Sequence, residues 1–272
     1  MKKITYSLFF VLLSNLFFSA ACKKAAPATI NDSETTTMSV EFDNIVGGQN
    51  LALNSGIYRN ASGEEFSVSL LQYFVSNIQL RKTDGTYYTL EQDSSYFLIK
   101  EGDAANRFAR FKVPPGDYNQ LVFMLGVDSL RSTMDITKRT GALDPSGTHE
   151  SGMYWGWNSG YIFFKMEGNS SAAPADPTGQ RKYRYHIGGF GGYSAPTINN
   201  IKKITIDLTA SGIVKPRLGR KANVHLLVDV LKVFNGTTTL SIALNPTVMF
   251  SAYSVNIANN YTAMFTHDHT EN

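Results

Sequence analysis

From residue 38 onward, hydrophobic and polar residues alternate in short runs, which is the pattern of half-buried β-strands. The alternation is strict over residues 38–42 and 108–113. Further runs rich in β-branched and aromatic residues span 66–75, 76–80, 87–90, 96–99, 118–127, 182–187, 201–208, 224–231 and 237–244. The pattern predicts an all-β fold, a single antiparallel β-sandwich with long loops and a few short helices.

Turn-forming residues separate these runs. Asp84-Gly85 between two strand-like runs is typical of a hairpin, and residues 169–181, rich in Ser, Ala, Pro and Gly, are expected to form a surface loop. Short helices are predicted near residues 129–137 and 243–251. Because no internal repeat or second linker interrupts the pattern, we expect one domain over residues 38–272.

The first residues have a different pattern. A basic start is followed by an apolar run over residues 4–18 and by small residues before Cys22, which predicts a secretory signal peptide over residues 1–21. Cys22 is the only cysteine, and its position favours cleavage before it and acylation of its thiol; the alternative is ordinary cleavage that leaves an incidental free thiol. Residues 22–37 would then be a lipidated, flexible tether.

Acyl chains on Cys22 would hold the protein on a membrane without a spanning helix. The predicted location is therefore the cell envelope, on the outer membrane with a periplasmic or surface face. The chain is 43% hydrophobic and 17% charged, as globular domains are, and its net charge is only +3. No basic tract interleaved with aromatics points to nucleic acid, so we expect no nucleic-acid partner.

Signatures of common enzymes do not occur in the sequence. It has no Gly-x-Ser-x-Gly elbow, no His-Glu-x-x-His motif and no phosphate-binding loop. Acidic residues such as Glu64, Glu65, Asp93 and Glu101 have no spacing that would pair them for glycoside hydrolysis. We therefore expect a binding protein rather than an enzyme.

The densest aromatic stretch spans residues 149–164 and contains both tryptophans, Trp155 and Trp157. Their spacing of two places both rings on one face of an extended chain. Such a stretch either fills a core or forms a site. If the rings of Trp155, Trp157 and Tyr161 were exposed, they would suit a carbohydrate-binding module, because sugars stack on aromatic faces.

Residues 152–161, Gly-Met-Tyr-Trp-Gly-Trp-Asn-Ser-Gly-Tyr, resemble the signature of the MbnP-like family of copper-binding proteins, which is related to the CorA/MopE-type copper proteins of methane-oxidising bacteria. Residues 58–66, 73–80, 123–128 and 185–188 resemble other blocks of that family, in order. The resemblance covers roughly residues 38–270. It implies a β-sandwich that binds copper for acquisition or storage.

The resemblance also implies a type of site. In some family members a tryptophan is oxidised to kynurenine by a di-haem peroxidase-like enzyme and joins histidines in holding copper. Here Trp155 is the first candidate for that modification, and Trp157 the second. His186, in a Tyr-His-Ile-Gly block, is the first-choice histidine ligand, although a hydrogen-bonded strand residue is the alternative. This chain has Asn44 and Trp157 at positions where family members often carry histidine.

Three further histidines are candidate ligands, because imidazole suits Cu(II). His149 precedes the tryptophans, and His267 and His269 form an H-x-H pair whose rings would share one side of an extended strand. Terminal residues of this kind are also often simply exposed. His225 is expected to be a satisfied strand residue.

Two other metal sites are conceivable from the sequence. Met153 beside Trp155 would suit Cu(I), which prefers soft ligands. Asp128 and Asp144 would offer oxygen ligands to a structural calcium ion.

Overall fold

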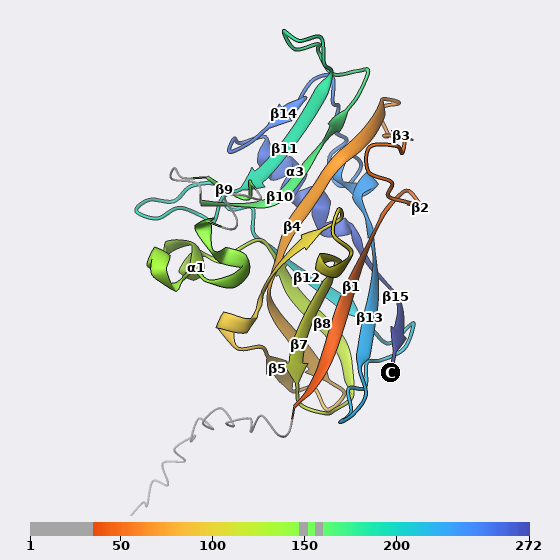
Figure 1. Ribbon diagram of the computed structural model, residues 1–272, viewed down its shortest axis with the longest axis vertical. Helices are drawn as coiled ribbons and strands as arrows, with labels where there is room; N and C mark the ends of the chain where they lie inside the picture. The colour runs from red at the N-terminus through yellow and green to blue at the C-terminus, as the bar shows by residue number, and fades with distance from the viewer. Residues whose placement is uncertain (1–34, 147–151, 156–159) are drawn as a thin grey trace, which may run out of the picture.

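The structure is a computed structural model that describes residues 35–146, 152–155 and 160–272. Two β-sheets pack face to face into an elongated sandwich (Figure 1). The first sheet has the order β15-β13-β1-β2, and β7 also pairs with β1. Its strands are β1 (Thr36–Val46), β2 (Gln49–Asn50), β7 (Phe108–Val113), β13 (Ala222–Asp229) and β15 (Phe265–Glu271).

The second sheet has the order β12-β8-β4-β10-β11-β14, with β3, β5 and β6 on β4 and β9 on β10. Its strands are β3 (Tyr58–Arg59), β4 (Glu65–Lys82), β5 (Tyr87–Thr89), β6 (Tyr96–Lys100), β8 (Tyr118–Leu125), β9 (Tyr154–Trp155), β10 (Gly160–Asn169), β11 (Lys182–Gly188), β12 (Lys202–Asp207) and β14 (Thr247–Val248).

Helices are short in the described residues. They include the α-helices α1 (Ser129–Thr133) and α3 (Ser254–Asn260). The others are single 3-10 turns: η2 (Gln92–Ser94), η3 (Ala104–Arg107), η4 (Ile136–Lys138), η5 (Gly141–Leu143), η6 (Val230–Val233) and η7 (Tyr261–Ala263). No helix in these parts of the chain is both long and apolar enough to cross a membrane.

The predicted all-β sandwich is confirmed, but its sheets are mixed rather than purely antiparallel. β1 runs parallel to β13, with Met38 opposite Ala222 and Ile45 opposite Asp229, and β11 runs parallel to β14. Parallel neighbours need a long crossover between them, so no local turn signal announces the pairing. The first sheet is therefore assembled from segments far apart in the sequence.

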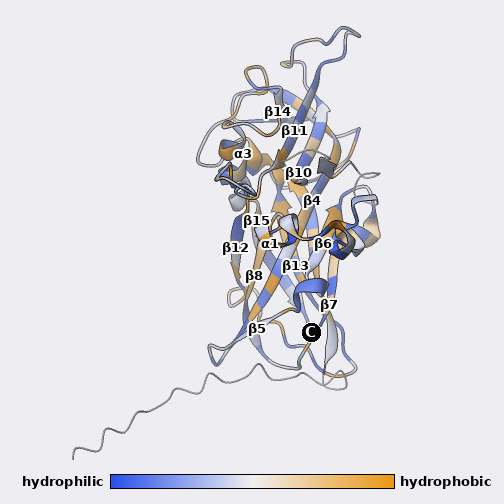
Figure 2. Cartoon of the chain, turned by 90° about the vertical axis from the view of Figure 1, so that its left-hand side faces the viewer, coloured by the Kyte–Doolittle hydropathy of each residue, from blue (hydrophilic) through white to orange (hydrophobic). Residues whose placement is uncertain are grey.

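Alternation along the strands builds the core. In β1, Met38, Val40 and Phe42 point inward and are buried, whereas Glu41 and Asp43 are partly exposed on the outer face. Figure 2 shows this alternation of hydrophobic and hydrophilic residues along the strands. Each sheet thus buries one face against the other and leaves one face for polar chemistry.

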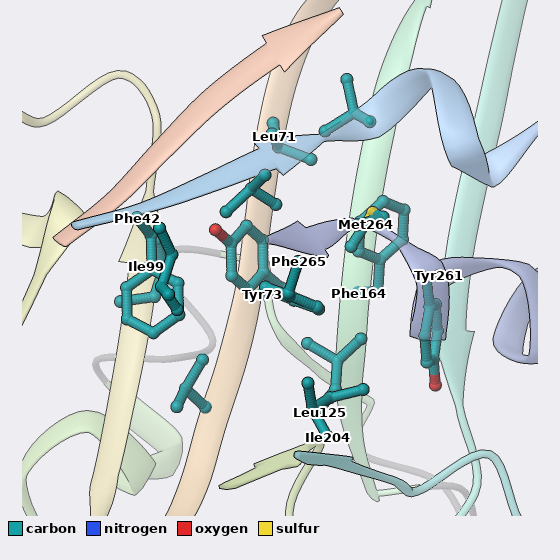
Figure 3. Close-up of a cluster of buried hydrophobic side chains, with 14 of the residues drawn as sticks. Phe42, Leu71, Tyr73, Ile99, Leu125, Phe164, Ile204, Tyr261, Met264 and Phe265 are labelled. Atoms are coloured by element: carbon teal, nitrogen blue, oxygen red, sulfur yellow. The ribbon is translucent and has the colours of Figure 1, made fainter. Parts of the chain in front are cut away.

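Aromatic rings join the two sheets at the centre (Figure 3). The Phe42 ring meets Tyr73 and Phe123 edge-on, with centroid distances of 6.1 and 5.9 Å, and Phe123 meets Phe265 at 5.1 Å. The Tyr73 hydroxyl donates a hydrogen bond to Asn44 Oδ1 at 3.0 Å. Burial raises the pKa of Tyr73, so its hydroxyl remains a donor.

A second, smaller core lies on the outer face of the second sheet. Phe74 points away from the main core because its neighbours Tyr73 and Val75 point into it. Val127, Leu143 and Met153, from the segment between β8 and β10 that also contains α1 (Figure 1), pack with this ring. The cluster consists of Phe74, Val127, Leu143, Met153, Tyr161, Ile162, Phe163 and Phe190.

Most predicted strands are present, and the Asp84-Gly85 hairpin is confirmed by the pairing of β4 with β5. Runs 66–75 and 76–80 form one strand, β4, that is interrupted at Asn77, where φ is +51°. The predicted helix at 129–137 is confirmed as α1 and η4, and residues 170–181 form the loop between β10 and β11.

Two predictions near the C-terminus are wrong. Residues 237–244 form no strand, because the Glu64 carboxylate accepts hydrogen bonds from the backbone amides of Ile242 at 2.7 Å and Ala243 at 3.0 Å. The predicted helix at 243–251 is instead a set of turns around the short strand β14, and α3 begins only at Ser254.

We predict that Phe42→Ala will lower the free energy of unfolding by about 3–5 kcal/mol, because it leaves a cavity between the sheets. Denaturant unfolding followed by circular dichroism measures the change. Leu244→Ala is the matched control, since 81% of Leu244 is exposed and its truncation should have little effect. Equal losses in the two variants would contradict the central place of Phe42.

Candidate functional site

Much of the aromatic stretch is core. Met153 is buried, and Tyr161 is 0% exposed, with its hydroxyl donating to the Leu143 carbonyl at 2.6 Å. The Tyr161 ring packs edge-on against Phe74 at 5.7 Å. Tyr161 therefore cannot act as a stacking platform for sugars. Met153 is also buried, so its sulfur is not available at the surface to bind a metal.

Trp155, in contrast, is only partly buried. It pairs with Gly160 in the short β9–β10 ladder. A Cβ atom placed on Gly188 would lie only 2.9 Å from Cζ3 of the Trp155 ring, so the indole rests directly on that glycine. Gly188 is two residues beyond His186 in β11, and side chains two apart share a face. Trp155 and His186 therefore lie on the same outer face of β11.

His186 is held by a carboxylate. Its Nε2 atom lies 2.7 Å from Oε1 of Glu167 on the neighbouring strand β10. The hydrogen bond from His186 lowers the pKa of Glu167, which favours an ionised carboxylate at neutral pH. Lys165 Nζ lies 3.6 Å from the same Glu167 oxygen and donates to the Gly152 carbonyl at 3.1 Å. This lysine thus ties the signature segment to the face that carries His186.

Several predicted residues lie outside the described part of the chain. They are His149, Trp157 and Cys22. Their roles as ligand, modified tryptophan and lipid-bearing cysteine stay predictions.

The C-terminal histidines do not share one side, contrary to the H-x-H prediction. His269 pairs with His225 and His267 with Leu226, so Asp268 is the extra residue of a β-bulge. Paired residues point to the same side of a sheet. His267 therefore lies on the side of Leu226, where its Nε2 is 2.9 Å from Thr270 Oγ1, and burial lowers its pKa.

The bulge instead gathers His225, Asp268 and His269. Asp268 Oδ2 lies 3.1 Å from His225 Nδ1 and 2.8 Å from His269 Nδ1. The hydrogen bond from His269 lowers the pKa of Asp268. The sequence prediction missed His225, because its neighbourhood depends on which strand pairs with β13.

The calcium prediction gains no support from the geometry. Asp128 caps α1 by accepting from the Arg131 amide at 2.9 Å, and its other oxygen accepts from Tyr96, Asn77 and Gln92. Asp144 forms a turn with Ser146. Within the described ranges, neither aspartate belongs to a group of three or more potential metal ligands.

The packed sheets and the outward-facing histidines define a β-sandwich protein with candidate ligand sites on its outer faces. The chain matches the MbnP family model over residues 35–250 and therefore belongs to the MbnP family, which is linked to copper and methanobactin. The family resemblance noted in the sequence is confirmed.

One similar solved structure is MbnP from Methylosinus trichosporium. Its TM-score is 0.52 at 18% sequence identity, with 80% of this chain and 82% of that chain covered. At this identity the likeness supports the fold alone. No curated protein matches the chain.

We predict that Asp128→Asn will lower the free energy of unfolding by about 1–2 kcal/mol at neutral pH, because the cap and its network lose an ionised acceptor. Although burial alone raises the pKa of Asp128, hydrogen bonds from Tyr96, Asn77 and the Arg131 amide bring it below its usual 3.8. A lowered folded-state pKa stabilises the protein above the unfolded value, and that stabilisation disappears as pH falls through the folded value.

The difference between the wild type and Asp128→Asn should therefore shrink below about pH 4 in urea unfolding measured across pH. In a Tyr96→Phe background, the loss caused by Asp128→Asn should also be smaller. A difference that stays constant down to acid pH would contradict this role.

Proposed function

We propose that this protein binds copper in the cell envelope, for acquisition or storage, at the outer face of β10 and β11. The observation that carries the proposal is the placement of the Trp155 ring on Gly188, on the face where Glu167 holds His186, in a member of the MbnP family. His186 is the first-choice ligand.

The contact between His186 and Glu167 fits a metal-binding histidine. Such histidines usually give one ring nitrogen to a carboxylate, which orients the ring and makes the other nitrogen a better ligand. Here Nε2 faces Glu167, which leaves Nδ1 for copper. Lys165 offsets the charge of Glu167, so the imidazole rather than the carboxylate is the expected donor.

Trp155 contributes differently before and after modification. An indole ring has no lone pair suited to a metal, whereas kynurenine carries an aromatic amine and a ketone. Oxidation by a di-haem peroxidase-like partner would therefore turn a packing residue into a ligand. Trp157 is the second candidate for this change, and His149 is the reserve histidine. The role is binding, not catalysis.

We predict that His186→Ala will lower the copper content of the protein isolated from its native envelope, because this variant removes the first-choice ligand. Metal analysis measures the content, and Arg184→Ala is the control because Arg184 lies two residues away on the same face of β11. Unchanged copper in His186→Ala would contradict the proposed ligand.

Trp155 and Trp157 are the only tryptophans, so tryptophan fluorescence reports on the signature segment. Copper bound here should quench it in the wild type and in Arg184→Ala, and much less in His186→Ala. Peptide mass spectrometry tests the maturation step, since conversion of Trp155 to kynurenine adds about 4 Da. An unmodified peptide from the native protein would remove the peroxidase-like partner from the proposal.

We further propose that lipids on Cys22 anchor the protein. Cys22→Ser should move it from the membrane fraction to the soluble fraction, because acyl chains provide the attachment. Fractionation with immunodetection measures this, and Ser33→Ala in the predicted tether, which keeps the cysteine and the residues before it, is the control. A soluble wild type with a free thiol would support the alternative of ordinary cleavage.

A further inference from the structure

Three metal-ligating side chains meet on the outer face of the first sheet, on the other side of the sandwich from Trp155 and His186. They are His225 of β13 and Asp268 and His269 of β15. One potential ligand atom from each lies within 4.8 Å of the others. Among the described residues, this is the one such group. Asp268 and His269 lie beyond residues 35–250, the stretch that matches the family model.

The separations suit a shared ion. Asp268 Oδ2 is 3.1 Å from Nδ1 of His225 and 2.8 Å from Nδ1 of His269. Two donors bound to one ion at about 2.0–2.2 Å lie roughly 3 Å apart when the angle between them is near 90–110°. The two imidazole rings are 4.8 Å apart at their centroids and tilted by 34°. An ion can therefore bind with small side-chain rotations.

The backbone places these groups. A bulge sets two residues of one strand opposite one residue of its partner, and here Asp268 and His269 both face His225. His225 belongs to a strand paired on both sides, with β1 and β15. Its side chain is only 15% exposed, which limits the orientations of its ring. The site is thus built on sheet backbone rather than on a loop.

Each of the two histidines also has a second carboxylate near its other ring nitrogen. Asp43 Oδ2 on β1 lies 3.7 Å from His225 Nε2, and Glu271 Oε1 lies 3.8 Å from His269 Nε2. Each imidazole therefore has one nitrogen towards Asp268 and the other near a separate carboxylate. Carboxylates in this outer position orient histidine ligands and strengthen their binding.

From this geometry we infer that His225, Asp268 and His269 form a second metal site, which binds one divalent transition-metal ion. Two imidazoles and a carboxylate are donors that suit Cu(II) and Zn(II), and the affinity series places Cu(II) first. The absence of a sulfur ligand from the group disfavours Cu(I). A bound ion would also join the C-terminal strand β15 to β13. The inference does not depend on copper binding at His186.

The test uses the full chain without a histidine tag, stripped with a chelator and titrated calorimetrically with Cu(II) alone and Zn(II) alone. We expect His269→Ala to weaken one binding event by at least about tenfold, since even outer-shell changes reach that size. His267→Ala is the matched control on the same strand. His269 is 50% exposed, so its truncation should leave the fold intact.

Other readouts separate this site from the one at His186. Cu(II) bound here should show nitrogen hyperfine coupling from two histidines in electron paramagnetic resonance, and it should leave tryptophan fluorescence unquenched. Zn(II) should raise the melting temperature of the wild type and of His186→Ala, but not of His269→Ala, because an ion that binds only the folded state stabilises it.

Asp268→Asn provides a second variant and should also weaken binding. Titrations that are identical in the wild type, His269→Ala and Asp268→Asn would overturn the inference. The inference would also be overturned if the wild type bound only one ion and that ion quenched tryptophan fluorescence. Loss of quenching in His186→Ala, with calorimetric binding retained, would separate the two sites.

Discussion

The parallel pairing of β1 with β13 is the constraint on which the rest of the structure depends. It joins segments about 180 residues apart, with Glu41 opposite His225. On the inner face, it brings Phe42 to the centre of the aromatic core, against Phe123 of the other sheet. On the outer face, it sets Asp43 beside His225. One ladder therefore controls both the packing of the sandwich and the acidic surroundings of a histidine.

Strand alternation explains why the candidate chemistry lies on the outer faces. The inner faces are occupied by large apolar side chains, so polar residues of the same strands must point outward. In the second sheet this places Glu167 and His186 side by side. In the first sheet it exposes His225 to the bulge of β15. The two candidate sites are thereby separated by the whole core, which allows each to be tested without the other.

The tryptophan stretch combines packing with the proposed site, and the two roles belong to different residues. Met153 and Tyr161 are buried in the smaller core, whereas Trp155 lies over Gly188 at the edge of that core. The buried ring of Tyr161 removes one of the three residues expected for sugar stacking. The smaller core in turn holds Trp155 on the face of β11 that carries His186, which favours the copper proposal.

The sequence by itself determined most of the strands and the family. Alternation at residues 38–42 and 108–113 predicts strands because one face of each must be buried. The signature around Trp155 and the block around His186 identify the family. Only the tertiary structure decided the parallel partner of β1, the bulge that separates His267 from His269, and the contact of His225 with Asp268. Pairing between distant strands depends on how whole sheets pack, and no local pattern of residues encodes that choice.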